Sequence, residues 1–185
     1  LQPITMHSLL RADRAVRAVV QAMLFGTGPA SKFPLLTGAL VKTRPELDHP
    51  DIQCHFLPGL STAAVRWNPF AQAGPNDGHG FFANAYQLRP ESMGELRLAS
   101  ADPFEAPRIT ANYLATETDR RTIRDAVKLL RRIFAQPAFD PYRDREMSPG
   151  ADIQSDQEID DWVRETAESV FHPVGTCRMG VGRDW

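Results

Sequence analysis

Apolar residues along this chain of 185 residues follow two different spacings. Three- and four-residue spacing predicts amphipathic helices over residues 12–24, 123–134 and 159–166. Shorter apolar runs predict strands between the first two helices, over residues 35–43, 51–57, 81–88, 95–99 and 108–112. Strands grouped between helices are typical of an α+β fold, so we expect a mostly antiparallel sheet backed by helices.

Particular residues mark where the helices begin and end. Gly26 and Gly28 follow the first helix and lack the third glycine of a dinucleotide-binding fingerprint, so we interpret them as a helix stop. Thr116 is expected to cap the second helix. Ser155 and Glu158 predict a capping box at the start of the third helix.

Three segments complete the expected arrangement. The runs 81–88 and 95–99 are separated by a turn, so we expect them to pair as an antiparallel hairpin. Residues 2–10 are expected to form a short strand that ends near Ser8, a residue type that caps helices. Residues 58–80 form a long irregular segment, which suits either a functional lid over a pocket or a flexible insertion.

One histidine lies inside a predicted strand, residues 51–57. Alternation along a strand places Ile52 and Cys54 on one face and His55 on the other. A histidine on the polar face suits a binding site, and it equally suits a structural histidine that bonds to a neighbouring carbonyl group.

A second histidine, His172, stands directly before a proline in residues 171–180, Phe-His-Pro-Val-Gly-Thr-Cys-Arg-Met-Gly. The residue before a proline is disfavoured in helical backbone, so we expect His172 in a loop just after the last helix. Glycines at 175 and 180 bracket the loop and allow positive φ or the close approach of a ligand. Imidazole is the commonest general acid or base, although many loop histidines only bond to backbone.

Charge and cysteine content exclude several classes of protein. A net charge of -2 at pH 7 leaves no basic surface for nucleic acid. The most apolar stretch, residues 16–25, is too short to span a bilayer. Cys54 and Cys177 show neither zinc-site nor disulfide spacing, and a metal site built from His172 and Cys177 lacks further ligands. We therefore expect no metal and a cytoplasmic location, with peripheral attachment to a membrane left open.

Residues 172–180 resemble the histidine signature near the C-terminal end of glucose-methanol-choline (GMC) oxidoreductases, flavoenzymes that oxidise alcohols to carbonyls. Shorter stretches fall in the same order in choline-oxidase-like and choline-dehydrogenase-like members, at residues 51–56, 94–98, 112–114, 135–137 and 148–150. The resemblance thus covers nearly the whole chain. It implies the substrate-binding half of such an enzyme, an antiparallel sheet backed by helices.

The resemblance also implies roles for three residues. The signature histidine handles the substrate proton in this family, which implies that His172 is catalytic. His55 lines up with a strand histidine that contacts substrate in choline-oxidase-like members. Phe171 replaces a tyrosine that choline-specific members carry in an aromatic enclosure for the quaternary ammonium. The missing hydroxyl weakens the case for choline without excluding it.

The family pattern divides the chain into a substrate-binding domain, residues 1–171, and a signature loop, residues 172–185, that leads toward an FAD-binding domain. That domain and the family's second catalytic His or Asn fall outside the sequence, so we expect a piece of a longer protein. The full-length protein is expected to use FAD to oxidise a small primary alcohol to an aldehyde.

The isolated piece is expected to retain neither FAD nor activity, and no cofactor-binding residue is assigned within it. The alternative is a non-catalytic binding module that keeps the fold. The residues leave open the alcohol, the electron acceptor (oxygen, a quinone or another) and the oligomeric state.

Overall fold

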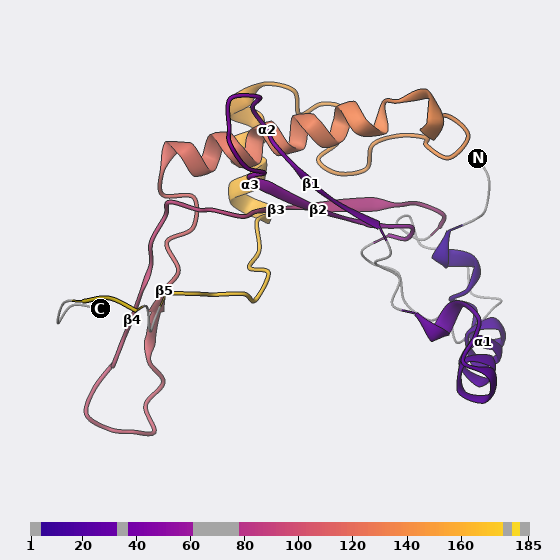
Figure 1. The fold of residues 1–185 in the computed structure, drawn as a ribbon, viewed down its shortest axis with the longest axis horizontal. Coiled ribbons are helices and arrows are strands. Elements are labelled where there is room, and N and C mark those ends of the chain that lie inside the picture. Colours follow the sequence, from indigo (N-terminus) through magenta and orange to yellow (C-terminus); the bar gives the residue numbers. More distant parts are fainter. Residues whose placement is uncertain (1–4, 33–36, 61–77, 176–178, 182–185) are drawn as a thin grey trace.

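The computed structural model describes residues 5–32, 37–60, 78–175 and 179–181 (Figure 1). Within these residues the helices are α1 (Ala12–Phe25), α2 (Glu117–Phe134) and α3 (Asp156–Thr166). The strands are β1 (Thr37–Val41), β2 (Ile52–Leu57), β3 (Phe82–Gln87), β4 (Glu95–Arg97) and β5 (Arg108–Thr110). Short 3₁₀ turns lie at Met6–Ser8, Pro29–Ser31 and Pro137–Phe139. The α+β class predicted from the sequence is confirmed.

The strands form two antiparallel sheets. β1, β2 and β3 pair in that order, with His55 of β2 opposite Gly38 and Asn84. β4 and β5 pair in a separate two-stranded sheet. The predicted hairpin between residues 81–88 and 95–99 is therefore wrong, because β3 pairs with β2 and β4 pairs with β5.

A buried carboxylate explains why the chain turns away after β3. Asp119 of α2 is 1% exposed and accepts hydrogen bonds from the backbone N–H groups of Glu91 at 2.9 Å and Ser92 at 2.8 Å. It also accepts from Gln87 Nε2 at 2.7 Å and from the Ser92 hydroxyl. These bonds hold the connection against the first turn of α2, so β4 begins beyond the end of the larger sheet (Figure 1).

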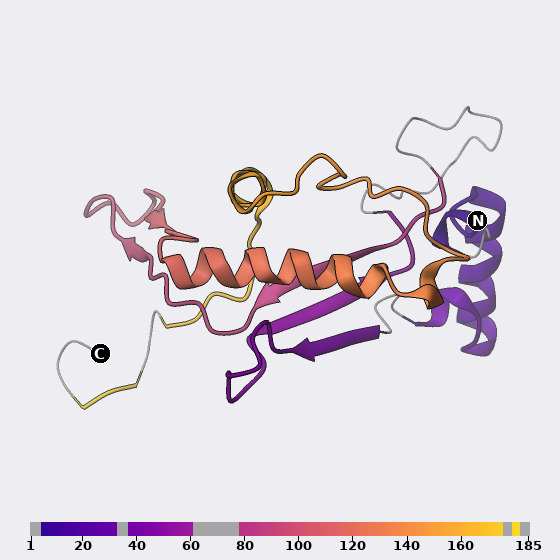
Figure 2. The ribbon, with the colours of Figure 1, turned by 90° about the horizontal axis from the view of Figure 1, so that it is seen from above.

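The core lies between the three-stranded sheet and α2, which crosses one face of that sheet (Figure 2). Ile52 and Cys54 of β2 are buried together with Ala126 of α2. Four phenylalanine rings with centroids 5.1 to 6.4 Å apart extend the core: Phe56, Phe81, Phe134 and Phe139. Because Ile52 and Cys54 take the covered face, His55 lies on the opposite face, as alternation predicts.

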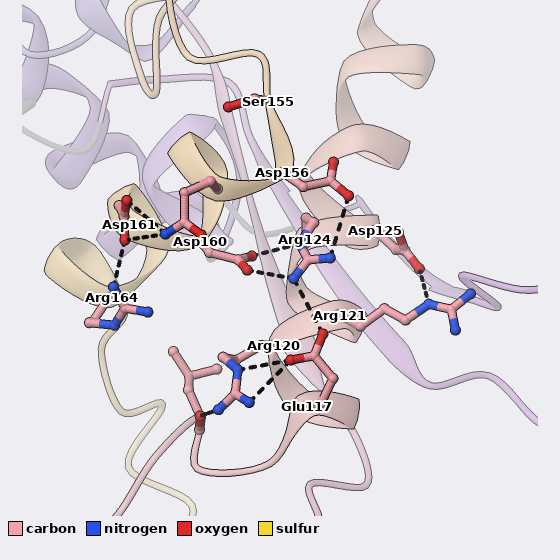
Figure 3. A network of polar contacts seen from close by, with 12 residues as sticks. Glu117, Arg120, Arg121, Arg124, Asp125, Ser155, Asp156, Asp160, Asp161 and Arg164 are labelled. Carbon is pink, nitrogen blue, oxygen red and sulfur yellow. Dashed lines mark hydrogen bonds and ion pairs between the residues drawn. The ribbon is translucent and has the colours of Figure 1, made fainter.

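Ion pairs fix α3 beside α2 (Figure 3). Arg124 of α2 contacts both carboxylate oxygens of Asp160 in α3, with Nε 2.7 Å from Oδ1. The same guanidinium lies 3.4 Å from Asp156 and 3.5 Å from Glu117. The hydrogen bonds that Arg124 donates to Asp160 are the main reason that the pKa of Arg124 is raised. Both caps predicted for these helices are confirmed, at Thr116 and at Ser155.

α1 ends as predicted and begins differently. Gly26 takes a φ of 63°, a left-handed conformation that ends the helix. The residue before the first turn is Arg11, and Met6–Ser8 form a 3₁₀ turn. The strand expected over residues 2–10 and the cap expected at Ser8 are therefore wrong in the described part, residues 5–10. No helix in the described ranges has both the length and the apolar character needed to cross a membrane.

Two apolar surfaces are uncovered. On α1, Val16, Val20 and Met23 are 56%, 47% and 80% exposed. On the β4–β5 pair, Leu96 and Ile109 are 54% and 69% exposed. α1 and the β4–β5 pair lie toward opposite ends of the larger sheet, and both lie on the side away from α2 (Figure 1).

Candidate functional site

The candidate site is the face of the β1–β2–β3 sheet that α2 leaves open, which we call the open face. Paired residues of antiparallel strands project to the same side, so the register identifies its members. They are Gly38, Leu40, Gln53, His55, Leu57, Phe82, Asn84 and Tyr86. Within the three strands the open face carries no Asp, Glu, Lys or Arg. The open face therefore combines hydrogen-bonding groups with apolar side chains, and its strands offer no carboxylate to pair with a cation.

His55 is half-buried on the open face and held in one orientation. Its Nε2 lies 2.8 Å from the side-chain Nε2 of Gln53. Because an amide nitrogen donates, His55 Nε2 accepts, and the neutral ring carries its proton on Nδ1. The Tyr86 ring packs at an edge, with centroids 4.9 Å apart and an interplanar angle of 67°. The His55 imidazole is therefore fixed by its neighbours before any ligand arrives.

Gly38 provides the space beside this imidazole. A Cβ at position 38 would lie 2.9 Å from the carbonyl oxygen of Cys54 and 3.7 Å from Cδ2 of His55. The first distance is too short for a side chain, so β1 and β2 approach each other closely only because residue 38 is glycine. A side chain at position 38 would therefore also crowd the His55 ring.

Asn84 and Tyr86 extend the polar part of the open face along β3. The side-chain Nδ2 of Asn84 donates to the Tyr86 hydroxyl at 3.1 Å. Neither residue was identified from the sequence as a site residue. Alternation within residues 82–87 places the two side chains on one face, but only the register with β2 reveals that this is the face of His55.

His172 and Phe171 follow α3 in irregular backbone, which confirms the predicted loop position. The Phe171 side chain is 87% exposed, with a φ of 58°, and its N–H donates to Ser169 Oγ at 3.0 Å. His172 is exposed and makes no hydrogen bond or ion pair with the described residues. The segment runs from α3 toward the β4–β5 pair (Figure 1), and the structure brings neither residue into contact with His55 among the residues that it describes.

The thiol of Cys54 is part of the core. Cys54 is 6% exposed, and burial raises the pKa of its thiol above the ordinary value. A raised pKa keeps the thiol protonated and unreactive. Cys177, Arg178 and the central part of the expected lid, residues 61–77, lie outside the described residues. Among the described residues no three His, Cys, Asp or Glu side chains gather as metal ligands would.

The two glycines after α1 are not placed to bind the pyrophosphate of FAD. Gly26 and Gly28 follow the C-terminal end of α1, where carbonyl groups rather than N–H groups are unpaired. That end of a helix carries partial negative charge and disfavours a phosphate. Gly26 and Gly28 are therefore not part of a pyrophosphate site.

A family model described as GMC oxidoreductase matches residues 90–184. Oxygen-dependent choline dehydrogenase from Brucella ovis is 43% identical over 183 residues, covering 99% of this chain and 32% of that protein. The enzyme of the same name from Pseudomonas putida is 40% identical over 179 residues, covering 97% of this chain and 30% of that protein. The chain thus spans about a third of the length of these curated relatives.

Solved structures share the fold. Formate oxidase from Aspergillus oryzae RIB40, in a variant studied for FAD modification, aligns with a TM-score of 0.77 and 22% identity. That alignment covers 94% of this chain and 34% of the formate oxidase chain. Pyridoxine 4-oxidase from Mesorbium loti aligns with a TM-score of 0.60 and 25% identity, over 80% of this chain and 28% of that one.

Proposed function

Because this chain belongs to the GMC oxidoreductase family, we propose that it is the substrate-binding part of an FAD-dependent enzyme that oxidises a primary alcohol to an aldehyde. The observation that carries the proposal is the family match over residues 90–184, since it includes His172. In the proposed organisation residues 1–171 form the substrate-binding domain. Residues 172–185 form the loop that leads toward the FAD-binding part.

Oxidation of an alcohol requires loss of the hydroxyl proton and of a hydride from the carbon atom. Bound FAD supplies the hydride acceptor. In the proposal the neutral imidazole of His172 accepts the hydroxyl proton, a contribution that is typically worth about 10²- to 10⁴-fold in rate. His172 is exposed in this chain, so none of the described residues buries the proposed base.

His55 and Phe171 are proposed to hold the substrate. The contact with Gln53 leaves the Nδ1–H of His55 as a donor to the substrate oxygen, in an orientation set by packing against Tyr86. The Phe171 ring, adjacent in sequence to the proposed base, adds an apolar contact. Residues that are fixed before binding lose less entropy when the substrate arrives.

The partner of this chain is proposed to be the FAD-binding part of the same full-length protein. The uncovered apolar side chains of α1 and of the β4–β5 pair flank the open face and are the surfaces expected to contact it. Exposed apolar patches of this kind usually mark interfaces. The purified 185-residue chain is accordingly expected to be colourless, and a stoichiometric flavin absorbance in it would contradict this assignment.

A second candidate is a non-catalytic binding module that keeps the fold. The observation that favours it is the lack of contact between His172 and His55 among the described residues. A full-length gene that lacks either a dinucleotide-binding fingerprint upstream or a second His or Asn downstream would support this reading. A gene that encodes both would support the enzyme.

The test uses the full-length protein in oxygen-linked and dye-linked assays with a panel of primary alcohols. Replacement of His172→Ala is expected to lower kcat/KM by about 10²- to 10⁴-fold, because the proton acceptor is lost. The matched control is His49→Ala, since His49 is also an exposed loop histidine that precedes a proline. Undiminished activity of His172→Ala would overturn the proposal.

A further inference from the structure

Tyr86 has an unassigned hydrogen-bond donor on the open face. Its phenolic oxygen accepts from Asn84 Nδ2 at 3.1 Å, and the amide of Gln53, opposite Tyr86 in the register, is already directed at His55. None of the described residues accepts the Tyr86 hydroxyl proton. The Tyr86 hydroxyl is accessible on the open face, so its proton can be donated to an acceptor supplied by a ligand.

The Tyr86 ring lies beside the His55 ring, and the contacts of Asn84 and Tyr86 orient its hydroxyl group. Asn84 lies directly opposite His55 in the register, and the Tyr86 ring contacts the His55 ring at an edge. The bond from Asn84 restricts the rotation of the Tyr86 hydroxyl, since its oxygen must face the amide. The phenol proton and the Nδ1–H of His55 are thus two donors on one face, carried by neighbouring strands.

The charge of the open face restricts the ligand. A quaternary ammonium is normally recognised by a carboxylate or by several aromatic ring faces. The strands of the open face carry no carboxylate, and its two aromatic rings besides His55 are Phe82 and Tyr86, of which Tyr86 is in a T-shaped contact with the His55 ring. Donor hydrogens present their positive ends to the ligand, which favours an electronegative atom over a cation.

We propose that Tyr86, oriented by Asn84, donates a hydrogen bond to an uncharged oxygen acceptor of the substrate, and that it thereby selects alcohols that carry a second oxygen beyond the reacting hydroxyl. This inference rests on the proposed function and adds a specificity-determining residue to it. The substrate class is a neutral, oxygen-bearing primary alcohol.

The test compares two substrates of nearly equal size on the full-length protein, 3-methoxypropan-1-ol and pentan-1-ol, which differ by an ether oxygen in place of a methylene. Replacement of Tyr86→Phe removes only the hydroxyl group. The ratio of kcat/KM for the ether to kcat/KM for the alkanol is expected to fall about two- to tenfold, as for one neutral hydrogen bond. Most of the loss is expected for the ether, with pentan-1-ol changed by less than about twofold.

Tyr142→Phe is the matched control, because Tyr142 is a partly exposed tyrosine in the turn after α2 and no part of the open face. It is expected to leave the ratio unchanged. A second arm compares choline with its uncharged carbon isostere, 3,3-dimethylbutan-1-ol, and the isostere is expected to be the better substrate of the wild type. An unchanged ratio in Tyr86→Phe, equal losses on both alcohols, or a preference for choline would each overturn the inference.

These outcomes are separate from a failure of the proposed function. Full activity of His172→Ala contradicts the proposed proton acceptor whatever Tyr86→Phe does. An inactive His172→Ala combined with an unchanged substrate ratio in Tyr86→Phe contradicts only the role of Tyr86.

Discussion

Asp119 is the residue whose contacts do most to shape the chain. Burial alone would raise its pKa. The hydrogen bonds from the Ser92 hydroxyl, from the backbone N–H groups of Glu91 and Ser92 and from Gln87 outweigh that effect and lower the pKa below 3.8. The carboxylate therefore stays ionised while it fixes the connection between β3 and β4 to the start of α2. Three segments of the fold depend on this single side chain.

Replacement of Asp119→Asn is expected to lower the free energy of unfolding by about 1–3 kcal/mol, because an amide nitrogen would face buried N–H donors. Urea unfolding of the 185-residue chain measures the change. The matched control is Asp161→Asn on α3, an exposed carboxylate paired with Arg164, where a much smaller change is expected because solvent screens the pair. Equal effects of the two substitutions would contradict the role given to Asp119.

The lowered pKa of Asp119 also predicts how the stability of the fold depends on pH. The folded chain binds the Asp119 proton less tightly than the unfolded chain, whose carboxyl group has a pKa near 3.8. The stabilisation is therefore fully present above the unfolded pKa and is lost as pH falls through the folded value below it. Asp119→Asn is expected to lose less stability than the wild type across this acidic range, and parallel curves would argue against the assignment.

At single positions the sequence predicts features that depend on neighbouring residues better than contacts between residues far apart in the chain. The face of His55 follows from alternation, because strands place neighbouring side chains on opposite sides. The contact of His55 with Tyr86 does not follow, since it depends on the register between β2 and β3. In the same way Thr116 is recognisable as a cap, whereas the bonds of Asp119 to residues about thirty positions earlier leave no local signal.

At the scale of elements, helices were predictable because periodicity and capping are properties of contiguous residues. The strands were located, but their pairing was not, because the turn after β3 is set by Asp119 on a later helix. For α1 the helix was predicted correctly, but the burial of its apolar side was not. Its apolar stripe predicts burial, yet Val16 and Met23 are exposed among the described residues, and the contact proposed for them is with the FAD-binding part.

Met23→Glu tests the proposed contact between α1 and the FAD-binding part of the full-length protein. In the isolated chain Met23 is 80% exposed, so the substitution is expected to change the free energy of unfolding by less than about 0.5 kcal/mol. In the full-length protein a carboxylate in an apolar contact is expected to lower the melting temperature by several degrees and promote flavin release. The control is Arg17→Glu on the charged side of α1, and equal melting temperatures for all three proteins would contradict the interface.

At the scale of the whole molecule, α2 covers one face of the main sheet with α3 beside it, and the other face is left open between α1 and the β4–β5 pair (Figures 1 and 2). The chain spans about a third of the length of its curated relatives. Its open face and the exposed apolar side chains of α1 and the β4–β5 pair suit the proposed contact with the FAD-binding part. The family resemblance identified His172 from its motif. No pattern in this sequence places His172 next to His55, and the structure shows no contact between them among the residues that it describes.

The most direct test of this account is the rate at which a saturating primary alcohol reduces the bound flavin in a single anaerobic turnover of the full-length protein. With His172→Ala the rate is predicted to fall by about 10²- to 10⁴-fold relative to the wild type, because the step that removes the hydroxyl proton loses its acceptor. His49→Ala is predicted to match the wild type. Flavin reduction in His172→Ala as fast as in the wild type would contradict the central claim.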